Sequence, residues 1–480
     1  MKRWLCFLMA VFLAISLLGC GGGDSSGAED PATPSNPSAP GGEADLSEAV
    51  VITLNGSAAG RGDGTPVKSY DYVWHITHDA VDGTGADAAP HEHYTGTAPN
   101  GEEIYIARDI RYFPQLDSGS FERFDYDGET EWGFKYTAPG WTDYYFATLP
   151  TEGYGDALPT SMMHSAEDAY NNPVLHITKA GTYVLTGTWN GQILVDLGDG
   201  AGKDEDAKVT LVLSGVTVRC AVAPALAFSK NVYECGPEKN ASHLVDTSNA
   251  GVNIIIADDT TNSFTGTNVY RILRPVWKTP DKSGVKQQKF LKIDGAFYSC
   301  RSMNVAGGSK GTGVLNINSE YEGLNTELHM TINGGVINIK AANDGINANE
   351  DDRSVVTING GVLDVASNLA GDGIDSNGWI VVNGGTITSI SSGGAESGFD
   401  SERGTYVFGG TITTDRIDHL HQEGGTITYV NGGNGAPGRD NPPGGGPGGN
   451  PPGGGGGTPP DGPGRTPPNM SGGVTGLSGV

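Results

Sequence analysis

The sequence predicts an all-β protein whose main part is a right-handed parallel β-helix of about 25 residues per coil. A Gly-Gly pair recurs along the chain, and its first residues lie 26, 24 and 25 positions apart (360−334, 384−360 and 409−384). β-branched residues precede and follow each pair. A period in the twenties is typical of a solenoid. Leucine-rich repeats share this period, but their regularly spaced Leu and helical segment are absent from the sequence, so a β-helix is favoured.

The residues around each glycine pair predict the core. Side chains alternate along a strand, and equivalent positions of successive coils stack about 4.8 Å apart. We therefore expect two inward columns of apolar residues, the first of Ile332, Ile358, Val382 and Val407, and the second of Ile337, Leu363, Ile387 and Ile412. The glycines permit the sharp turn between them.

A second motif, out of phase with the first, places one apolar residue after an acidic or polar turn. That residue is Leu324, Ile346, Ile374, Phe399 or Ile417 and is expected to face inward. The residues one and three positions later should then face outward. The first outward column would be Asn325, Asn347, Asp375, Asp400 and Asp418, and the second Glu327, Asn349, Asn377 and Glu402.

Stacked carboxylates at this spacing repel one another unless a cation or solvent separates them. Calcium accepts six to eight oxygen ligands, of the kinds that these columns offer. We therefore predict calcium as the cofactor, with ligands from Asn325, Glu327, Asp344, Asn347, Asn349, Asp372, Asp375, Asn377, Glu396, Asp400 and Glu402. Two alternatives stay open, namely asparagine ladders held by hydrogen bonds and plain solvated acidic turns.

The N-terminus indicates export. A basic head and an apolar run from Trp4 to Leu18 lead to Leu17-Leu18-Gly19-Cys20, which resembles a bacterial lipobox. We expect residues 1–19 to be a signal peptide, Cys20 to be lipidated, and the protein to be anchored in the cell envelope, at the outer membrane or cell surface. Residues 20–49 read as a flexible linker and residues 431–480 as a disordered Gly/Pro-rich tail.

Residues 50–170 form an aromatic-rich β region of unknown role, and residues 171–430 form the predicted β-helix. Residues 70–146 hold 17 of the 38 aromatic residues of the chain, a density that indicates packing rather than a linker.

The composition limits the partners. The formal net charge of −27 excludes nucleic acid and anionic membrane surfaces, so membrane contact is expected through the lipid anchor alone. Outside the signal peptide and Cys20, three cysteines remain, which allow one disulfide in an oxidising compartment. Cys220 and Cys235 would close a short loop and are the preferred pair. We expect a monomer.

The order of motifs resembles a bacterial family of calcium-binding, carbohydrate-binding β-helices with a pectate-lyase-like fold. The resemblance covers about residues 171–430. It rests on Ile177–Thr188, on Val209–Val216, on Asp258–Asn262 and on the Asp-Gly-Ile and Asn-Gly-Gly repeats. It implies non-catalytic, calcium-dependent binding of a polysaccharide, either cellulose or a pectic polymer. The sequence departs from the family pattern at residues 273–292 and at Cys220, Cys235 and Cys300.

Two alternative functions remain, a calcium-dependent polysaccharide lyase and a structural or adhesion protein. A lyase needs a Lys or Arg base beside the metal. The candidate bases are Arg301, Lys310, Lys340, Arg353, Arg403 and Arg416, none of which recurs with the repeat. No catalytic residue is therefore assigned.

Overall fold

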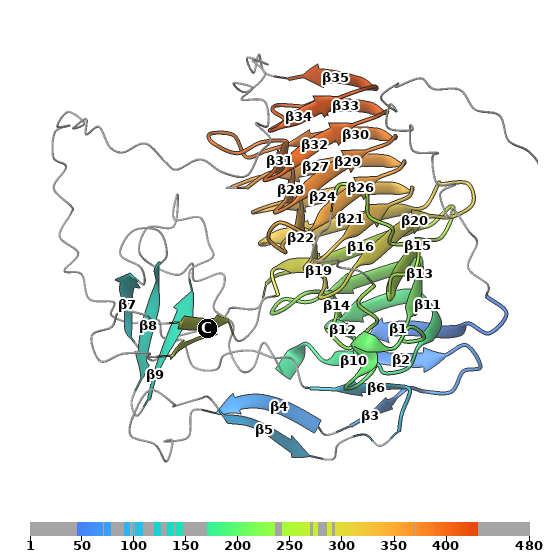
Figure 1. The fold of residues 1–480 in the computed structure, drawn as a ribbon. Helices are drawn as coiled ribbons and strands as arrows, with labels where there is room; N and C mark the ends of the chain where they lie inside the picture. Colours follow the sequence, from blue (N-terminus) through green and yellow to red (C-terminus); the bar gives the residue numbers. More distant parts are fainter. Residues whose placement is uncertain are drawn as a thin grey trace, which may run out of the picture. The chain divides into compact units, whose positions relative to one another are not determined.

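A computed structural model gives the fold (Figure 1). It describes residues 46–70, 72–77, 91–96, 99, 101–108, 120–125, 132–138, 141–146, 170–235, 242–268, 272–276, 286–289, 293–369 and 371–430. The signal peptide, Cys20, most of the predicted linker and the tail after residue 430 lie outside this part. Among the residues described, no helix has the length and hydrophobicity needed to cross a membrane.

The prediction of an all-β protein is confirmed, because the elements with defined bounds are strands apart from the 3-10 turn η2 (Ala201–Lys203). Most of them stack in parallel, as in a β-solenoid. The large sheet holds β1 (Val50–Gly56), β2 (Ala58–Arg61), β11 (Gly181–Asn190), β13 (Val209–Arg219), β15 (Val252–Ile256), β16 (Thr261–Gly266), β20 (Met303–Gly307), β21 (Val314–Ser319), β23 (Met330–Ile332), β24 (Val336–Ala341), β26 (Val355–Ile358), β27 (Val362–Ser367), β29 (Trp379–Val382), β30 (Thr386–Ile390), β32 (Gly404–Val407), β33 (Thr411–Thr414), β34 (Leu420–Gln422) and β35 (Thr426–Tyr429).

A second sheet of ten strands carries the acidic motif. In spatial order it holds β3 (Lys68–Ser69), β6 (Ile104–Ala107), β10 (Val174–Ile177), β12 (Gln192–Val195), β14 (Leu226–Phe228), β19 (Gly295–Ser299), β22 (Glu322–Thr326), β25 (Ile346–Ala348), β28 (Ile374–Ser376) and β31 (Phe399–Ser401).

The predicted core columns are confirmed. Strands β23, β26, β29 and β32 align Ile332, Ile358, Val382 and Val407 in register. Strands β24, β27, β30 and β33 align Ile337, Leu363, Ile387 and Ile412. Each of these eight side chains is at most 1% exposed. The two columns therefore form one apolar core that continues from coil to coil, and burial of this kind is the main stabilising term.

The glycine pairs form the turn between these columns. The second glycine of each pair has a positive φ, from 89° at Gly410 to 100° at Gly361, which favours glycine. Beside the turn, Asn383 Nδ2 donates to Asn359 Oδ1, and Asn359 Nδ2 donates to Asn333 Oδ1, each at 2.8 Å. An asparagine ladder thus exists in this protein at the glycine turn.

The first glycine of each pair packs more tightly toward the C-terminus. A Cβ atom at Gly334 would lie 3.7 Å from its nearest neighbour, whereas one at Gly409 would lie 2.4 Å from the Asn383 carbonyl oxygen. Gly409→Ala is therefore expected to destabilise the fold by about 1–3 kcal/mol, the usual cost of overpacking. Chemical denaturation measures the change, with Gly334→Ala as the matched control. Equal losses in the two variants would contradict this account.

Antiparallel strands close the N-terminal end of the stack. β2 pairs antiparallel with β1, and β6 pairs antiparallel with β10. These strands come from the predicted aromatic-rich region, yet they belong to the same two sheets as residues 171–430. The predicted boundary at residue 171 therefore does not separate two sheets, because the first coils use residues on both sides of it.

Among the described residues of the aromatic-rich region, the other strands belong to two antiparallel sheets. One pairs β4 (Tyr72–Thr77) with β5 (His91–Gly96). The other joins β7 (Ser120–Asp125), β8 (Trp132–Ala138) and β9 (Trp141–Phe146) to β17 (Ile272–Val276) and β18 (Lys286–Lys289). Strands β17 and β18 come from the segment that departs from the family pattern, so this insertion pairs with the aromatic-rich region.

Cys220, Cys235 and Cys300 are free thiols in the structure, so the preferred Cys220–Cys235 pair is not formed there. The two cysteines have different surroundings, which sequence spacing could not reveal. The Cys220 amide donates to Thr265 O, beside β16. The Cys235 carbonyl accepts from Ser302 Oγ at 3.0 Å, and its Sγ lies 4.0 Å from Asp246 O.

Candidate functional site

The first outward column exists as predicted. Strands β22, β25, β28 and β31 pair in parallel, and their register aligns Asn325, Asn347, Asp375 and Asp400. The neighbouring inward residues Leu324, Ile346, Ile374 and Phe399 are fully buried. A parallel bridge joins Phe399 to Ile417. Asp418, which follows Ile417, is therefore next to Asp400 in the column order. Alternation along each strand thus places an amide or a carboxylate from successive coils side by side.

This column is less exposed than an outward position suggests. Asn325 is 0% and Asn347 is 5% exposed, and both contact acidic residues nearby, Glu322 at the start of β22 or Asp344 in the turn before β25. Asn347 Nδ2 donates to Glu322 Oε1 and to Asp344 Oδ2, each at 3.1 Å. Asn325 Nδ2 donates to Glu322 Oε2. The side chains of Glu322 and Asp344 therefore cover the column and add carboxylates to it.

Glu322 was absent from the predicted ligands. It precedes Gly323-Leu324 as Asp344 precedes Gly345-Ile346, so alignment of the motif copies could have identified it. Glu396 was predicted instead for the later copy, but Ser397 occupies that position. The Ser397 amide donates to Asp372 Oδ1, and its Oγ donates to Asp418 Oδ2 at 2.6 Å. Glu396 comes one residue before this position, its charge acts on Asp372, and its metal role stays a prediction.

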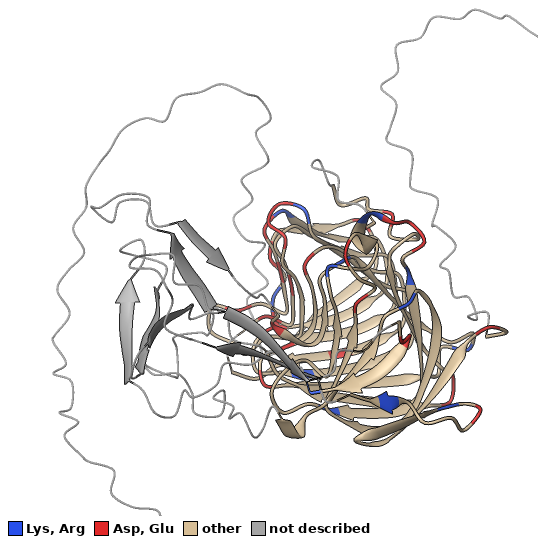
Figure 2. Cartoon of the chain, turned by 90° about the horizontal axis from the view of Figure 1, so that it is seen from below, with Lys and Arg blue, Asp and Glu red and all other residues tan. Residues whose placement is uncertain are grey.

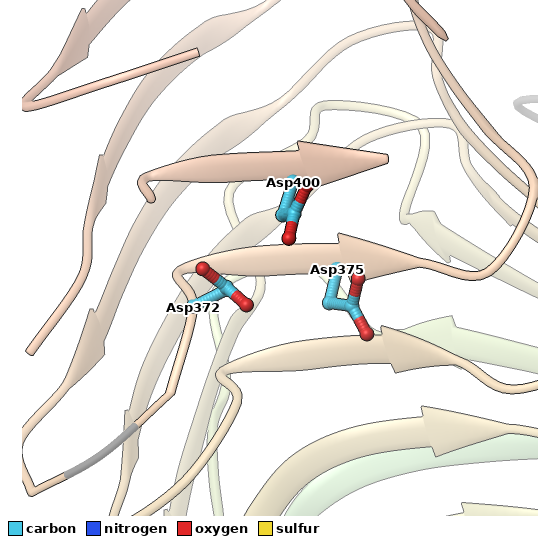
Figure 3. Close-up of side chains that lie close together, drawn as sticks. All are labelled: Asp372, Asp375 and Asp400. Atoms are coloured by element: carbon cyan, nitrogen blue, oxygen red, sulfur yellow. The ribbon is translucent and has the colours of Figure 1, made fainter. Parts of the chain in front are cut away.

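Three carboxylates come together at the C-terminal coils. Asp372, Asp375 and Asp400 each offer one oxygen, and these oxygens lie within 4.8 Å of one another (Figure 3). Asp372 comes from the turn before β28, Asp375 from β28 and Asp400 from β31. Elsewhere in the described stack, Asp and Glu are spread over turns with Lys and Arg among them (Figure 2). A cluster of three facing carboxylates is the strongest candidate for a cation site.

Burial and mutual repulsion disfavour the charged forms of these carboxyls. Burial, with Asp400 and Glu396 nearby, raises the pKa of Asp372 to about 7 despite the hydrogen bond from the Ser397 amide. Burial and the charge of Asp372 raise the pKa of Asp375 well above its usual value. The pKa of Asp344 is raised in the same way, by burial and by Asp375. A bound cation would offset both the repulsion and the lost hydration.

The donor set fits a hard cation such as calcium, which takes carboxylate and amide oxygens. Two further observations support the fit. Asn325 Oδ1 and Asn347 Oδ1 are buried and accept no hydrogen bond from protein atoms, although buried polar oxygens are ordinarily paired. Both side chains belong to the column that continues into Asp375 and Asp400. Glu322, Asp344 and these amide oxygens could therefore contribute ligands in the coils next to the three carboxylates.

The second predicted column is held by hydrogen bonds. Asn377 Nδ2 donates to Asn349 O at 2.9 Å and to Asp351 Oδ1 at 2.8 Å. Asn349 Nδ2 lies 3.5 Å from Glu327 Oε1, which also accepts from the Tyr298 hydroxyl at 3.2 Å. The Glu402 amide donates to Ser376 O, which places Glu402 at the next step. For this column the structure favours the hydrogen-bonded alternative, and its metal role stays a prediction.

Most of the cationic side chains that could serve a lyase as base are held in ion pairs. Arg416 Nη2 lies 3.1 Å from Asp418 Oδ2, and its Nε donates to Ser397 Oγ at 2.6 Å. The other ion pairs are Arg301–Glu234, Lys310–Asp259, Arg353–Glu350 and Arg403–Asp352. Lys340 lies on β24, in the other sheet from the carboxylate cluster.

Comparison with known proteins identifies a matching protein family. A family model described as carbohydrate-binding domain-containing protein matches residues 171–234 and 237–436, which is more than half of the chain. A curated relative of the same description, from Acetivibrio thermocellus, is 29% identical over 167 residues. That match spans 34% of this chain and 44% of the relative, so less than half of the relative's length is covered.

Among solved structures, the polysaccharide lyase-like protein from C. thermocellum, a gadolinium derivative, matches with a TM-score of 0.33 and 24% identity. The match covers 54% of this chain and 88% of that chain. The family model matches the segment that contains the inward columns, the glycine turns and the acidic column. The protein belongs to the family of carbohydrate-binding domain-containing proteins.

Proposed function

We propose that this protein is a surface-anchored, non-catalytic polysaccharide-binding protein whose binding depends on calcium. The observation that carries the proposal is the facing trio Asp372, Asp375 and Asp400, continued by the buried amide oxygens of Asn325 and Asn347. The family supports carbohydrate as the ligand class. Calcium supplies positive charge that can rigidify the coils and can bridge protein carboxylates to an acidic sugar.

The proposal includes the architecture and the location. The parallel stack would be a right-handed β-helix with coils of about 25 residues, because crossovers between parallel strands strongly favour that hand. Lipidation of Cys20, in the lipobox-like motif, would anchor the chain to the cell envelope. The anchored protein would be a monomer that binds polysaccharide outside the cell. Incorporation of a labelled fatty acid, lost in Cys20→Ala, tests the anchor.

The lyase alternative receives less support from the geometry. A base must reach the substrate carbon next to the cation-bound carboxylate. Arg416, the candidate that contacts the column through Asp418, is also hydrogen-bonded to Ser397. The absence of catalysis is therefore part of the proposal, and ultraviolet-absorbing unsaturated products from polygalacturonate would contradict it.

The binding experiment uses soluble polygalacturonate and insoluble cellulose, each with calcium and with a chelator. We expect the protein to bind at least one of them in calcium and to lose affinity by at least about tenfold in chelator, since loss of even outer metal partners costs 10–100-fold. The double substitution Asp372→Asn with Asp375→Asn should give the same loss. Asp364→Asn, an exposed aspartate on β27, is the matched control. Unchanged binding in chelator would contradict the calcium dependence alone.

A further inference from the structure

Residues 242–250 form a strap on the outer face of the large sheet, with a turn at residues 248–249. One end of this strap is fixed by hydrogen bonds. Thr247 Oγ1 lies 2.8 Å from Asn304 Oδ1 on β20 and 2.6 Å from Thr331 Oγ1 on β23. Asn304 Nδ2 also donates to Thr247 O at 2.8 Å. Thr247 is 5% exposed, so this anchor is buried against the sheet.

The other end of the strap is fixed by three stacked rings. The His243 ring lies 4.3 Å from the Tyr406 ring at an interplanar angle of 10°. The His421 ring lies 4.6 Å from the same Tyr406 ring at 14°. Because one face of a phenol ring accommodates one parallel ring at this distance, the two imidazoles occupy opposite faces. Tyr406 is on β32 and pairs in register with His421 on β34.

The two anchors lie several coils apart. In the register of the sheet, Thr331 is followed by Thr357, Val381 and Tyr406. Three strand spacings amount to about 14 Å, which four extended residues can just span. The strap therefore links the coils from β23 to β32, and His243 is its attachment to the C-terminal coils. Val381 is 3% exposed although Val382 fills the inward position of the same strand.

The charged and titratable groups around the stack set its response to protons. Burial of His243 and the charge of His421 lower the pKa of His243, while Glu423 acts in the opposite direction. In the strap, the Asp246 carboxylate accepts from the Ser248 amide at 2.8 Å. A neutral imidazole can stack on Tyr406 at little cost. A charged His243 imidazolium would lose hydration in the same position, which disfavours the closed strap.

We infer that the strap is a pH-sensitive clasp, closed on the C-terminal coils by the stacking of neutral His243 on Tyr406 and opened when His243 is protonated. A histidine with a lower pKa in the closed form than in the open form binds fewer protons when closed. Closure is then fully favoured above the ordinary histidine pKa of about 6.5 and weakens as the pH falls below it. The inference requires neither carbohydrate nor calcium binding.

Hydrogen exchange of the full chain, read by mass spectrometry at pH 7.5 and pH 5.0 and corrected for intrinsic rates, tests the clasp. In the wild type we expect exchange of residues 242–250 to rise by at least about threefold at pH 5.0, a modest effect for linkage to the one proton taken up by His243. His243→Phe with His421→Phe keeps three stacked rings but removes the titration, so its exchange should be independent of pH. A wild-type strap with no pH response would overturn the inference, as would an equal response in the phenylalanine variant.

Three further single variants separate the effect of the histidines from a general loosening of the strap. Thr247→Ala releases the other anchor and should raise exchange of the strap equally at both pH values. The single substitutions His243→Phe and His421→Phe should each reduce the pH response. These single variants replace the double variant if it fails to fold. Carboxylate titration elsewhere in the stack is common to all variants and cancels in the comparison. A pH response that follows Thr247→Ala but not the histidine substitutions would also overturn the inference.

Discussion

The substitution Asp375→Asn is expected to stabilise the calcium-free protein and to abolish the stabilisation that calcium provides. In the absence of a cation, Asp375 is half-buried beside Asp372 and Asp400, and its charged form is disfavoured. Asparagine preserves the shape and continues the column of Asn325 and Asn347 while removing one negative charge. We expect a gain on the order of 1–3 kcal/mol without calcium, from relief of repulsion and desolvation.

With calcium the effect should reverse. A ligand at about 100 times its dissociation constant stabilises the native state by about 2.7 kcal/mol, or roughly 5–10 °C in Tm for a domain of this size. Asp375→Asn removes a proposed ligand and should lose most of this gain, whereas Asp364→Asn should keep it. Thermal unfolding with calcium and with chelator measures both effects. Loss of stability in chelator would indicate that the Asp375 carboxylate has a purely structural role.

The pH dependence of the calcium-free protein has a definite sign. The pKa of Asp375 is higher in the folded than in the unfolded protein, so the folded state binds more protons above the unfolded value of about 3.8. Its contribution to stability therefore declines as the pH rises above that value. The difference in stability between Asp375→Asn and wild type should grow from pH 4 toward neutrality. A difference that is constant over this range would contradict the raised pKa.

Removal of a core ring in the same coils should give the largest loss of stability. Phe399 is fully buried on β31 and lies between Ile374 and Ile417 in the stack. Phe399→Ala is expected to lower the free energy of unfolding by about 3–5 kcal/mol, through lost burial and the remaining cavity. Urea denaturation followed by circular dichroism measures the loss.

Val362→Ala is the control, because Val362 is 48% exposed on the outer face of β27. It should change stability by no more than about 0.5 kcal/mol, as surface substitutions ordinarily do. In a stack of coils each unit contacts its neighbours, so Phe399→Ala should also increase hydrogen exchange first in β31 and β28. Equal losses in the two variants would contradict the assignment of inward and outward positions.

The sequence alone predicts the alternation of the strands and therefore the columns. Ile332 and Ile337 face inward and Asn347 and Asp375 stack outward, because the period of two in a strand leaves no other arrangement once the coils are aligned. The sequence pattern predicts which residues form the column but not how deeply their side chains are buried. Burial of Asn347 depends on Glu322 at the start of β22 and on Asp344 in the turn before β25, and these contacts join different coils.

Contacts between segments far apart in the sequence cannot be predicted from the repeat pattern. In the strap, Thr247 precedes its hydrogen-bond partner Thr331 by 84 residues, and the strap contains no copy of the repeat motifs. The strands β1 and β6 join the stack from a region whose aromatic composition differs from that of the coils. The free thiols of Cys220 and Cys235 show the same point, since a short sequence separation does not imply that two side chains face each other.

The antiparallel strands β2 and β6 give the stack two different ends, and this difference has a consequence for reach. The chain enters the stack at the closed end, near β1, whereas Asp400 lies on β31, the eighth strand beyond β6 in its sheet. Eight strand spacings correspond to about 38 Å. With the proposed anchor at Cys20, the polymer would be held that much farther from the point where the tether joins the fold. Under that proposal, the coils between the two ends would act as a spacer between the anchor and the bound polymer.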